Sequence, residues 1–292
     1  MVHTSCTIES CGTFVACEIH LAFLIQPRYL GFNSPFGEWT NLHRFYSIMP
    51  AISLEHVYKS YGGNDYALHD IHLTFAENVT TAVVGTSGSG KSTLLQLING
   101  LERPSQGKVF VFGNEIDYAR LPMLRRRLGY AVQGTGLFPH LSVAENITLL
   151  AVLEKWEAPR IQARTEELMQ LVGLPLDFAG RYPHQLSGGQ QQRVGLCRAM
   201  MLDPKIFLLD EAFGALDPIT RSEIHEEFLH LQKAAPRTIV MVTHDLKEAL
   251  KLAQQIIILD KGRIEQIGSG EQMLENPATE FVVNFFKSQL GA

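Results

Sequence analysis

A glycine-rich loop directly after a short apolar run is the first stretch that could do chemistry. The run TAVV is followed by GTSGSGKST, which fits the pattern G-x-x-x-x-G-K-[ST]. Its glycines let backbone N–H groups turn toward one point, and the start of the following helix adds to this nest for an anion. The lysine reaches β- and γ-phosphates, and the serine hydroxyl after it is a ligand for Mg²⁺. We therefore predict an ATP- or GTP-binding loop made of Gly85, Thr86, Ser87, Gly88, Ser89, Gly90, Lys91, Ser92 and Thr93.

Two acids at the end of a second apolar run are the expected partners of this loop. The stretch IFLLDE, Ile206 to Glu211, places Asp210 to hold Mg²⁺ together with Ser92. Glu211 is placed to orient and deprotonate an attacking water. A pair of helix-capping acids is the alternative, but both acids directly follow four residues of a buried strand. The pair favours hydrolysis over transfer of the phosphoryl group to an acceptor.

A second glycine-rich segment, LSGGQQQRV, begins another predicted helix at Leu186 to Val194. Ser187, Gly188, Gly189 and Gln190 again combine close backbone access with a helix N-terminus, which suits phosphate. One nucleotide has a single γ-phosphate, and the first loop already surrounds its inner side. A second phosphate-binding element therefore indicates a two-fold, head-to-tail dimer in which each chain serves the nucleotide of the other.

On these residues the chain resembles the ATP-binding subunits of ABC transporters, whose signature is LSGGQ, from about Ile52 to Phe286. The resemblance implies ATP and Mg²⁺ as cofactors and an active ATPase. It further implies that Gln133 contacts Mg²⁺ and the attacking water, and that His244 touches the γ-phosphate. Asp217 ends the GALD loop, which the family places across the dimer interface. Ala212 departs from the family's frequent proline without affecting the hydrolytic positions.

The resemblance also implies that Tyr61 stacks on the adenine, because the family places an aromatic residue upstream of the glycine loop. Tyr58 and Tyr66 are close in sequence, so an ordinary turn tyrosine is the alternative for Tyr61.

The elements that must position these residues alternate between strand and helix from Ala51 onward, which indicates an α/β protein with a largely parallel sheet. After the strand-like AISLEHVYKS, strands are expected at 80–84, 108–112, 128–132, 206–209, 238–242, 256–259 and 263–267. Helices are expected at 91–99, 143–150, 160–171, 189–201, 218–232 and 246–252. The nearly all-helical pattern at 136–201 predicts an inserted helical subdomain, about 136–200. With the resemblance, the expected fold is an α/β P-loop NTPase (RecA-like) core with an N-terminal antiparallel β subdomain and that helical insertion, over residues 50–290.

The first 49 residues differ in character, with few charges, three of the four cysteines and no sustained periodicity. We interpret them as a disordered extension or as residues before a true start at Met49; a functional anchor is the alternative. The spacing of Cys6, Cys11 and Cys17 matches no common zinc pattern, so free thiols in a reducing compartment are expected.

The composition limits the partners. A net charge of −5 does not favour nucleic acid, and the run Arg125–Arg127 is either a local basic patch or a solvated helix face. No apolar run approaches the ~18–20 residues of a membrane span. We therefore expect a cytoplasmic chain, with any membrane function supplied by partners. The resemblance implies a peripheral position on the cytoplasmic face of the inner (plasma) membrane.

Family resemblance defines those partners as a second ATPase subunit, forming a homodimer, separate integral-membrane permease subunits, and a periplasmic or lipid-anchored solute-binding protein. Exposed-looking apolar residues after Gln133 could accept a helix of the permease, or they could belong to the core of the helical subdomain. These residues are Leu137, Phe138, Leu141 and Val143.

The solute is suggested by three stretches, GNDYALHDIHLTF, FGALDPITR and ENPATEFVVNFF, which resemble the quaternary-amine uptake subfamily. Such importers take up glycine betaine, choline, carnitine and related osmoprotectants. The chain stops at Ala292, so the paired regulatory domain of several members is expected to be absent. An exporter or lipid-trafficking subunit, and a soluble ATPase of translation or DNA repair, are the alternatives.

Overall fold

The computed structural model describes residues 50–62, 66–132, 134 and 136–290. The interpretation of residues 1–49 as an extension lies outside these residues and stays a prediction.

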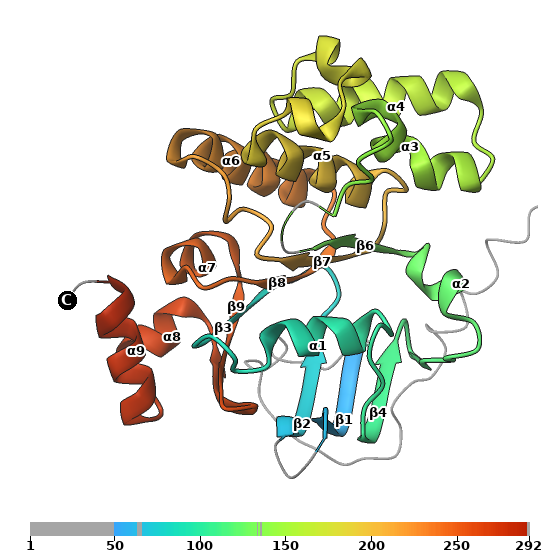
Figure 1. The fold of residues 1–292 in the computed structure, drawn as a ribbon. Helices are drawn as coiled ribbons and strands as arrows, with labels where there is room; N and C mark the ends of the chain where they lie inside the picture. Colours follow the sequence, from blue (N-terminus) through green and yellow to red (C-terminus); the bar gives the residue numbers. More distant parts are fainter. Residues whose placement is uncertain (1–49, 63–65, 133, 135, 291–292) are drawn as a thin grey trace, which may run out of the picture. The chain divides into compact units, whose positions relative to one another are not determined.

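A six-stranded sheet is the framework of the fold, with strand order β10-β9-β3-β8-β7-β6 (Figure 1). All neighbouring strands are parallel except β10, which is antiparallel to β9. The central strands β3, β7 and β8 are buried along their whole length, as expected for a parallel sheet covered on both faces. The expected, largely parallel sheet is thus confirmed. Its strands are β3 (Thr80–Val84), β6 (Leu128–Ala131), β7 (Ile206–Asp210), β8 (Thr238–Val242), β9 (Gln255–Asp260) and β10 (Arg263–Gly268).

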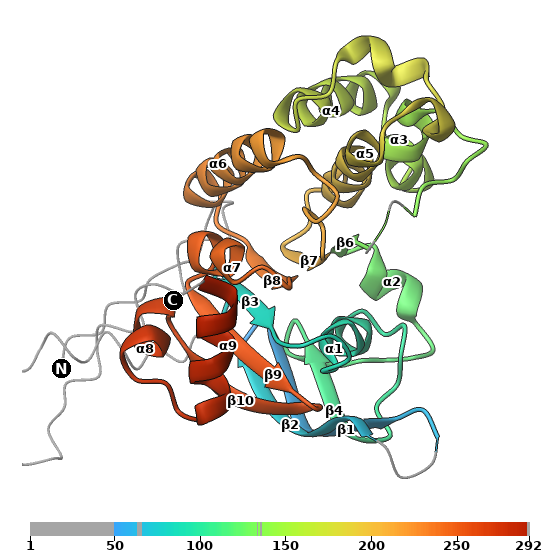
Figure 2. The same ribbon diagram turned by 60° about the vertical axis from the view of Figure 1, so that its left-hand side comes forward.

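A separate four-stranded antiparallel sheet, with order β2-β1-β4-β5, confirms the expected N-terminal β subdomain. Helix α1 (Lys91–Ile98) lies between this sheet and the parallel sheet, and its leucines share one core with both (Figures 1 and 2). The strands are β1 (Ile52–Ser60), β2 (Tyr66–Phe75), β4 (Gln106–Val111) and β5 (Asn114–Glu115).

Alternate residues of the parallel strands belong to two different cores. Val83 of β3 packs with α1 and the antiparallel sheet, whereas Ala82 and Val84 pack on the opposite side. The core on that side also contains the remaining large helices, which are α3 (Val143–Leu153), α4 (Ala158–Leu171), α5 (Gly188–Met200), α6 (Pro218–Ala234), α7 (Leu246–Leu252) and α9 (Glu280–Leu290). The two-residue period of a strand thus places the ends of β3 and β7 between two rigid layers.

The segment 136–201 is nearly all helical, as expected, and α3 packs on both α4 and α5. It also contains two 3-10 turns, η3 (Leu176–Gly180) and η4 (Pro183–Gln185). Helix α3 begins with a capping box in which Ser142 and Glu145 bond each other's backbone N–H groups. The ends of the predicted elements differ from the structure by no more than three residues. The strands β2 and β5 and the helices α2 (Leu121–Arg125), α8 (Gly270–Glu275) and α9 had no assignment from the sequence.

Two questions from the sequence are answered by packing. Val143 is buried in the helical core, so the expectation that it lines a permease groove is wrong, whereas Phe138 is exposed. Each arginine of the 125–127 run has its own local contact: Arg125 bonds the carbonyls of Asn99 and Gly100, Arg126 pairs with Glu154, and Arg127 lies over Phe112. The run is therefore no free basic patch. Among the described residues, no helix is long and apolar enough to cross a bilayer.

Candidate nucleotide-binding and hydrolysis site

The glycine loop lies between the end of β3 and the start of α1, in a conformation that excludes other residues at two positions. Gly85 and Gly90 have φ of 154° and 101°. A Cβ at Gly85 would lie 2.0 Å from the carbonyl oxygen of Leu259, and one at Gly90 would lie 2.4 Å from that of Ala67. Gly88, with φ of 76°, has nothing within 4 Å of such a Cβ, so its backbone is open to the cleft. This is the close backbone approach that a phosphate needs.

Lys91 spans the inside of this loop. Its ammonium donates hydrogen bonds to the carbonyl oxygens of Gly85 and Thr86, at 3.0 and 2.8 Å. Burial lowers the pKa of Lys91, while the carboxylates of Glu211 and Asp210 act in the opposite direction. The Lys91 ammonium thus lies inside the loop and interacts electrostatically with both carboxylates.

Asp210 is the last residue of β7 and is buried, and the Ser92 hydroxyl donates to its Oδ1 at 3.0 Å. Burial raises the pKa of Asp210 because it disfavours the ionised carboxylate. A cation beside this carboxylate would offset that cost. Ser92 and Asp210 supply the hard oxygen ligands that Mg²⁺ prefers. The described residues contain no group of three His, Cys, Asp or Glu side chains that could hold a metal alone. A site with one or two protein oxygens suits Mg²⁺, which takes its other ligands from phosphates and water.

Glu211 follows at the carboxyl end of β7, with a left-handed backbone of φ 48°. Its N–H bonds the carbonyl of Val242, which ends β8, at 3.0 Å. His244 follows that strand, and its Nδ1 lies 3.5 Å from Glu211 Oε2. Both side chains line one cleft of about 470 Å³ with the glycine loop, whose other lining residues are Ala67, Ser87, Gly88, Gly90, Lys91, Ser92 and Thr93.

Tyr61 is the tyrosine that lies at this loop. Its hydroxyl is 3.3 Å from Oγ1 of Thr93, and the side chain is 61% exposed. Tyr58 and Tyr66 instead form a ring cluster with His69, with centroids 5.1–5.8 Å apart. The geometry favours Tyr61 over its neighbours as a stacking residue.

The signature residues do not line the cleft of their own chain. Ser187 caps α5 in a capping box with Gln190, and both Ser187 and Gly188 are exposed. Asp217 is also exposed and caps α6, where hydrogen bonds from Thr220 lower the pKa of its carboxyl. The roles of Ser187, Gly188, Gly189, Gln190 and Asp217 toward a nucleotide stay predictions. Gln133 lies outside the described residues.

Sequence reasoning missed two side chains that hold the loop after Glu211. Gln192 is buried and bonds the backbone of both Glu211 and Ala215. Arg221 bonds the carbonyls of Gly214 and Leu216. The sequence could have indicated that Gln192 is buried, because helical periodicity places it on the same face as Leu196 and Ala199.

Comparisons with known proteins agree with this site. The family model for ABC transporters matches residues 68–214. The glycine betaine uptake system ATP-binding protein YehX of Escherichia coli (strain K12) is 48% identical over 241 residues, covering 82% of this chain and 78% of that protein. The choline transport ATP-binding protein OpuBA of Bacillus subtilis (strain 168) is 46% identical over 234 residues, covering 80% of this chain. Those residues are 61% of OpuBA, so the chain spans about three fifths of that relative.

Among solved structures, a similar one is the dimeric structure of a post-hydrolysis state of the ATP-binding cassette MJ0796 bound to ADP and Pi. It matches with a TM-score of 0.71 and 33% identity, over 75% of this chain and 98% of that one. The glycine loop, the acid pair and the signature helix thus occur together in a fold shared with known cassettes. The chain belongs to the ABC transporter family, as one of its ATP-hydrolysing ATP-binding proteins.

Proposed function

We propose that this chain drives the import of a quaternary amine, such as glycine betaine or choline, through a separate permease. The observation that carries this proposal is the 46–48% identity to the glycine betaine and choline ATP-binding proteins, over about four fifths of the chain. The residues of the cleft contact the nucleotide, so the class of solute is inferred from these relatives.

At the nucleotide, Lys91 exchanges its bonds with two loop carbonyls for bonds with the β- and γ-phosphates. Ser92, Asp210 and Gln133 would hold Mg²⁺, which would supply positive charge to neutralise the phosphates. Glu211 accepts the proton of the attacking water. His244, whose Nδ1 lies 3.5 Å from that carboxylate in the same cleft, contacts the γ-phosphate.

Completion of the site requires a second copy of the chain. The exposed caps of α5 and α6, at Ser187 and Asp217, lie outside their own cleft and are available to the nucleotide of a partner subunit. Two chains arranged head to tail bury two ATP molecules at one two-fold interface. A nearly complete switch from open to closed requires about 5.5 kcal/mol of preference of ATP for the closed dimer.

The closing movement reaches the membrane through permease subunits at the cytoplasmic face of the plasma membrane. The exposed Phe138 and the half-buried Leu137 and Leu141 offer apolar contacts for a permease helix. A periplasmic or lipid-anchored binding protein delivers the solute on the other side.

Uptake of labelled glycine betaine and choline tests the proposal, in cells that lack this gene and carry wild type, Glu211→Gln, Glu223→Gln or an empty vector. Glu223 is an exposed glutamate of α6 and is the matched control. We expect wild type and Glu223→Gln to restore uptake, and Glu211→Gln to behave as the empty vector. Equal uptake in all four strains would exclude these solutes. Higher cellular solute in the strain without the gene would indicate export instead.

A further inference from the structure

We propose that Gln192 is a positioning residue for Glu211, through which the signature helix α5 controls the hydrolytic site of its own chain. The inference deepens the proposed function, because it assumes that Glu211 activates the water and that the start of α5 meets the partner's nucleotide. It concerns hydrolysis alone and is independent of the transported solute.

The contact is short and shielded from water. The Gln192 side chain is 5% exposed. Its Nε2 donates to the carbonyl oxygen of Glu211 at 3.0 Å, and its Oε1 accepts from the N–H of Ala215 at 2.9 Å. Both ends of one amide are therefore used to fix the two ends of the turn after β7. A buried polar contact of this kind is costly to break, because the groups left behind have no water to replace it.

The backbone of Glu211 needs such support. Glu211 has a φ of 48°, and a residue with a Cβ adopts such a conformation at a cost of about 1–2 kcal/mol. This backbone conformation persists where neighbouring groups stabilise it. The N–H of Glu211 bonds Val242 at 3.0 Å, and its carbonyl accepts from Gly214 at 3.1 Å and from Gln192. The first two contacts come from β8 and from the turn itself. The third comes from α5, so it links the direction of the Glu211 side chain to the position of that helix.

Helix α5 connects this contact to the exposed cap at Ser187. Gln192 lies five residues after Ser187, which is about 7.5 Å along a rigid helix. A displacement of the cap on meeting the partner's nucleotide would therefore move Gln192 and the carbonyl of Glu211 with it.

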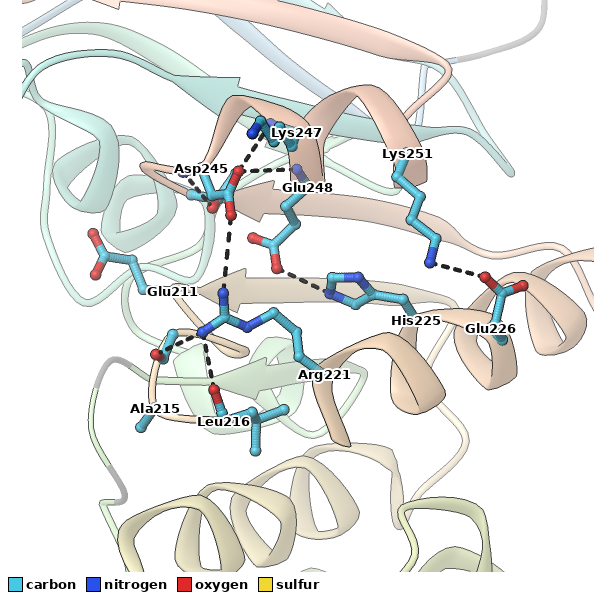
Figure 3. Close-up of polar contacts among 12 residues, drawn as sticks. Glu211, Ala215, Leu216, Arg221, His225, Glu226, Asp245, Lys247, Glu248 and Lys251 are labelled. Carbon is cyan, nitrogen blue, oxygen red and sulfur yellow. Dashed lines mark hydrogen bonds and ion pairs between the residues drawn. The ribbon is translucent and has the colours of Figure 1, made fainter. Parts of the chain in front are cut away.

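A second helix also holds the turn, on both sides of Ala215 (Figure 3). Arg221 of α6 donates to the carbonyls of Gly214 and Leu216, at 3.2 and 3.0 Å. Its guanidinium also lies 3.9 Å from the carboxylate of Asp245, the residue after His244. Gln192 contacts Ala215 as well as Glu211, so a movement of α5 acts on a turn that Arg221 ties to α6 and α7 on both sides of Ala215.

The test compares Gln192→Met with Gln232→Met in purified full-length protein. Gln232 is a matched control, since it is also buried and bonds a backbone carbonyl and N–H, both of Arg237. We expect both variants to lower the melting temperature. Gln192→Met alone should lower the kcat for ATP about tenfold, with the KM for ATP within twofold of wild type. Unchanged kcat in Gln192→Met, or an equal loss in both variants, would overturn the proposal.

A second comparison asks whether Gln192 acts through Glu211. In a Glu211→Gln background, Gln192→Met should change single-turnover phosphate release less than twofold. A further tenfold loss there would mean that Gln192 acts elsewhere. If Gln192→Met fails to fold, Gln192→Glu serves instead, since it keeps the acceptor for Ala215 but places an oxygen against the Glu211 carbonyl. It should lose at least as much kcat, and wild-type kcat would contradict the proposal.

Discussion

Replacing Tyr61 tests the predicted adenine contact, since the Tyr61 hydroxyl lies 3.3 Å from Oγ1 of Thr93 in the glycine loop. Stacking of a base on an aromatic ring contributes about 1–3 kcal/mol. The ring is 61% exposed and lies 4.7 Å from the Lys59 ammonium, so it keeps a free face but is not enclosed. We therefore expect the lower half of that range for Tyr61→Ala, about 1–2 kcal/mol, or an increase of about 5–30-fold in the Kd for ATP.

Three controls separate stacking from other effects, with Kd measured by calorimetry in the Glu211→Gln background, which slows hydrolysis. Tyr61→Phe removes the 3.3 Å contact with Thr93 and keeps the ring, so its Kd should rise less than threefold. Tyr66→Ala should bind ATP as wild type, because Tyr66 packs against Tyr58 and His69. Tripolyphosphate, which has no base, should bind Tyr61→Ala and wild type equally. The reasoning fails if Tyr61→Ala binds ATP within twofold of wild type, or if tripolyphosphate is weakened to the same extent.

Two further changes have sizes that follow from local contacts. Lys91→Met removes a charged hydrogen-bond donor for the phosphates, which is worth about 1.5–3 kcal/mol of binding free energy. The Kd for ATP should therefore rise about 10–150-fold, and a Kd within threefold of wild type would contradict the role of Lys91. His225 lies 3.0 Å from the Glu248 carboxylate, whose side chain is 7% exposed (Figure 3). His225→Leu leaves this buried carboxylate without its partner, so the free energy of unfolding measured in urea should fall by about 3 kcal/mol. Adding Glu248→Leu should recover most of that loss; a double variant as unstable as His225→Leu would show that the pair itself is not the cause.

The residues that line the cleft were predictable because their motifs are local. A turn with N–H groups aimed inward and a helix start fit into the nine residues from Gly85 to Thr93, directly after β3. The close approach of Leu259 and Ala67 leaves glycine as the residue that fits at 85 and 90. The acid pair was predictable for the same reason, since two carboxylates directly after a buried strand must lie at its carboxyl end.

Other features depend on register, which the sequence does not show. A left-handed His56, with φ 48°, shifts the pairing of β1 with β2, so period-two counting could not decide which tyrosine reaches the glycine loop. The sequence placed Val143 at the start of a helix, but its surroundings depend on how α3 packs, and the structure buries it in the core. Gln192 and Arg221 contact the turn that follows β7 from two different helices, and no sequence motif indicates these contacts.

Gln192 holds the turn from Glu211 to Asp217 at Glu211 and Ala215, and Arg221 holds it at Gly214 and Leu216, so coupling between the two side chains is measurable. Both helices that supply these side chains begin at an exposed cap, Ser187 for α5 and Asp217 for α6. A short turn held by both side chains has few independent arrangements, so loss of one contact should let the other relax. Gln192→Met and Arg221→Met should therefore lower kcat less in combination than the product of their separate effects, with a coupling energy of at least about 0.5 kcal/mol. Strict additivity in this cycle would mean that the contacts of Gln192 and Arg221 act separately, and that α5 and α6 do not position Glu211 as one unit.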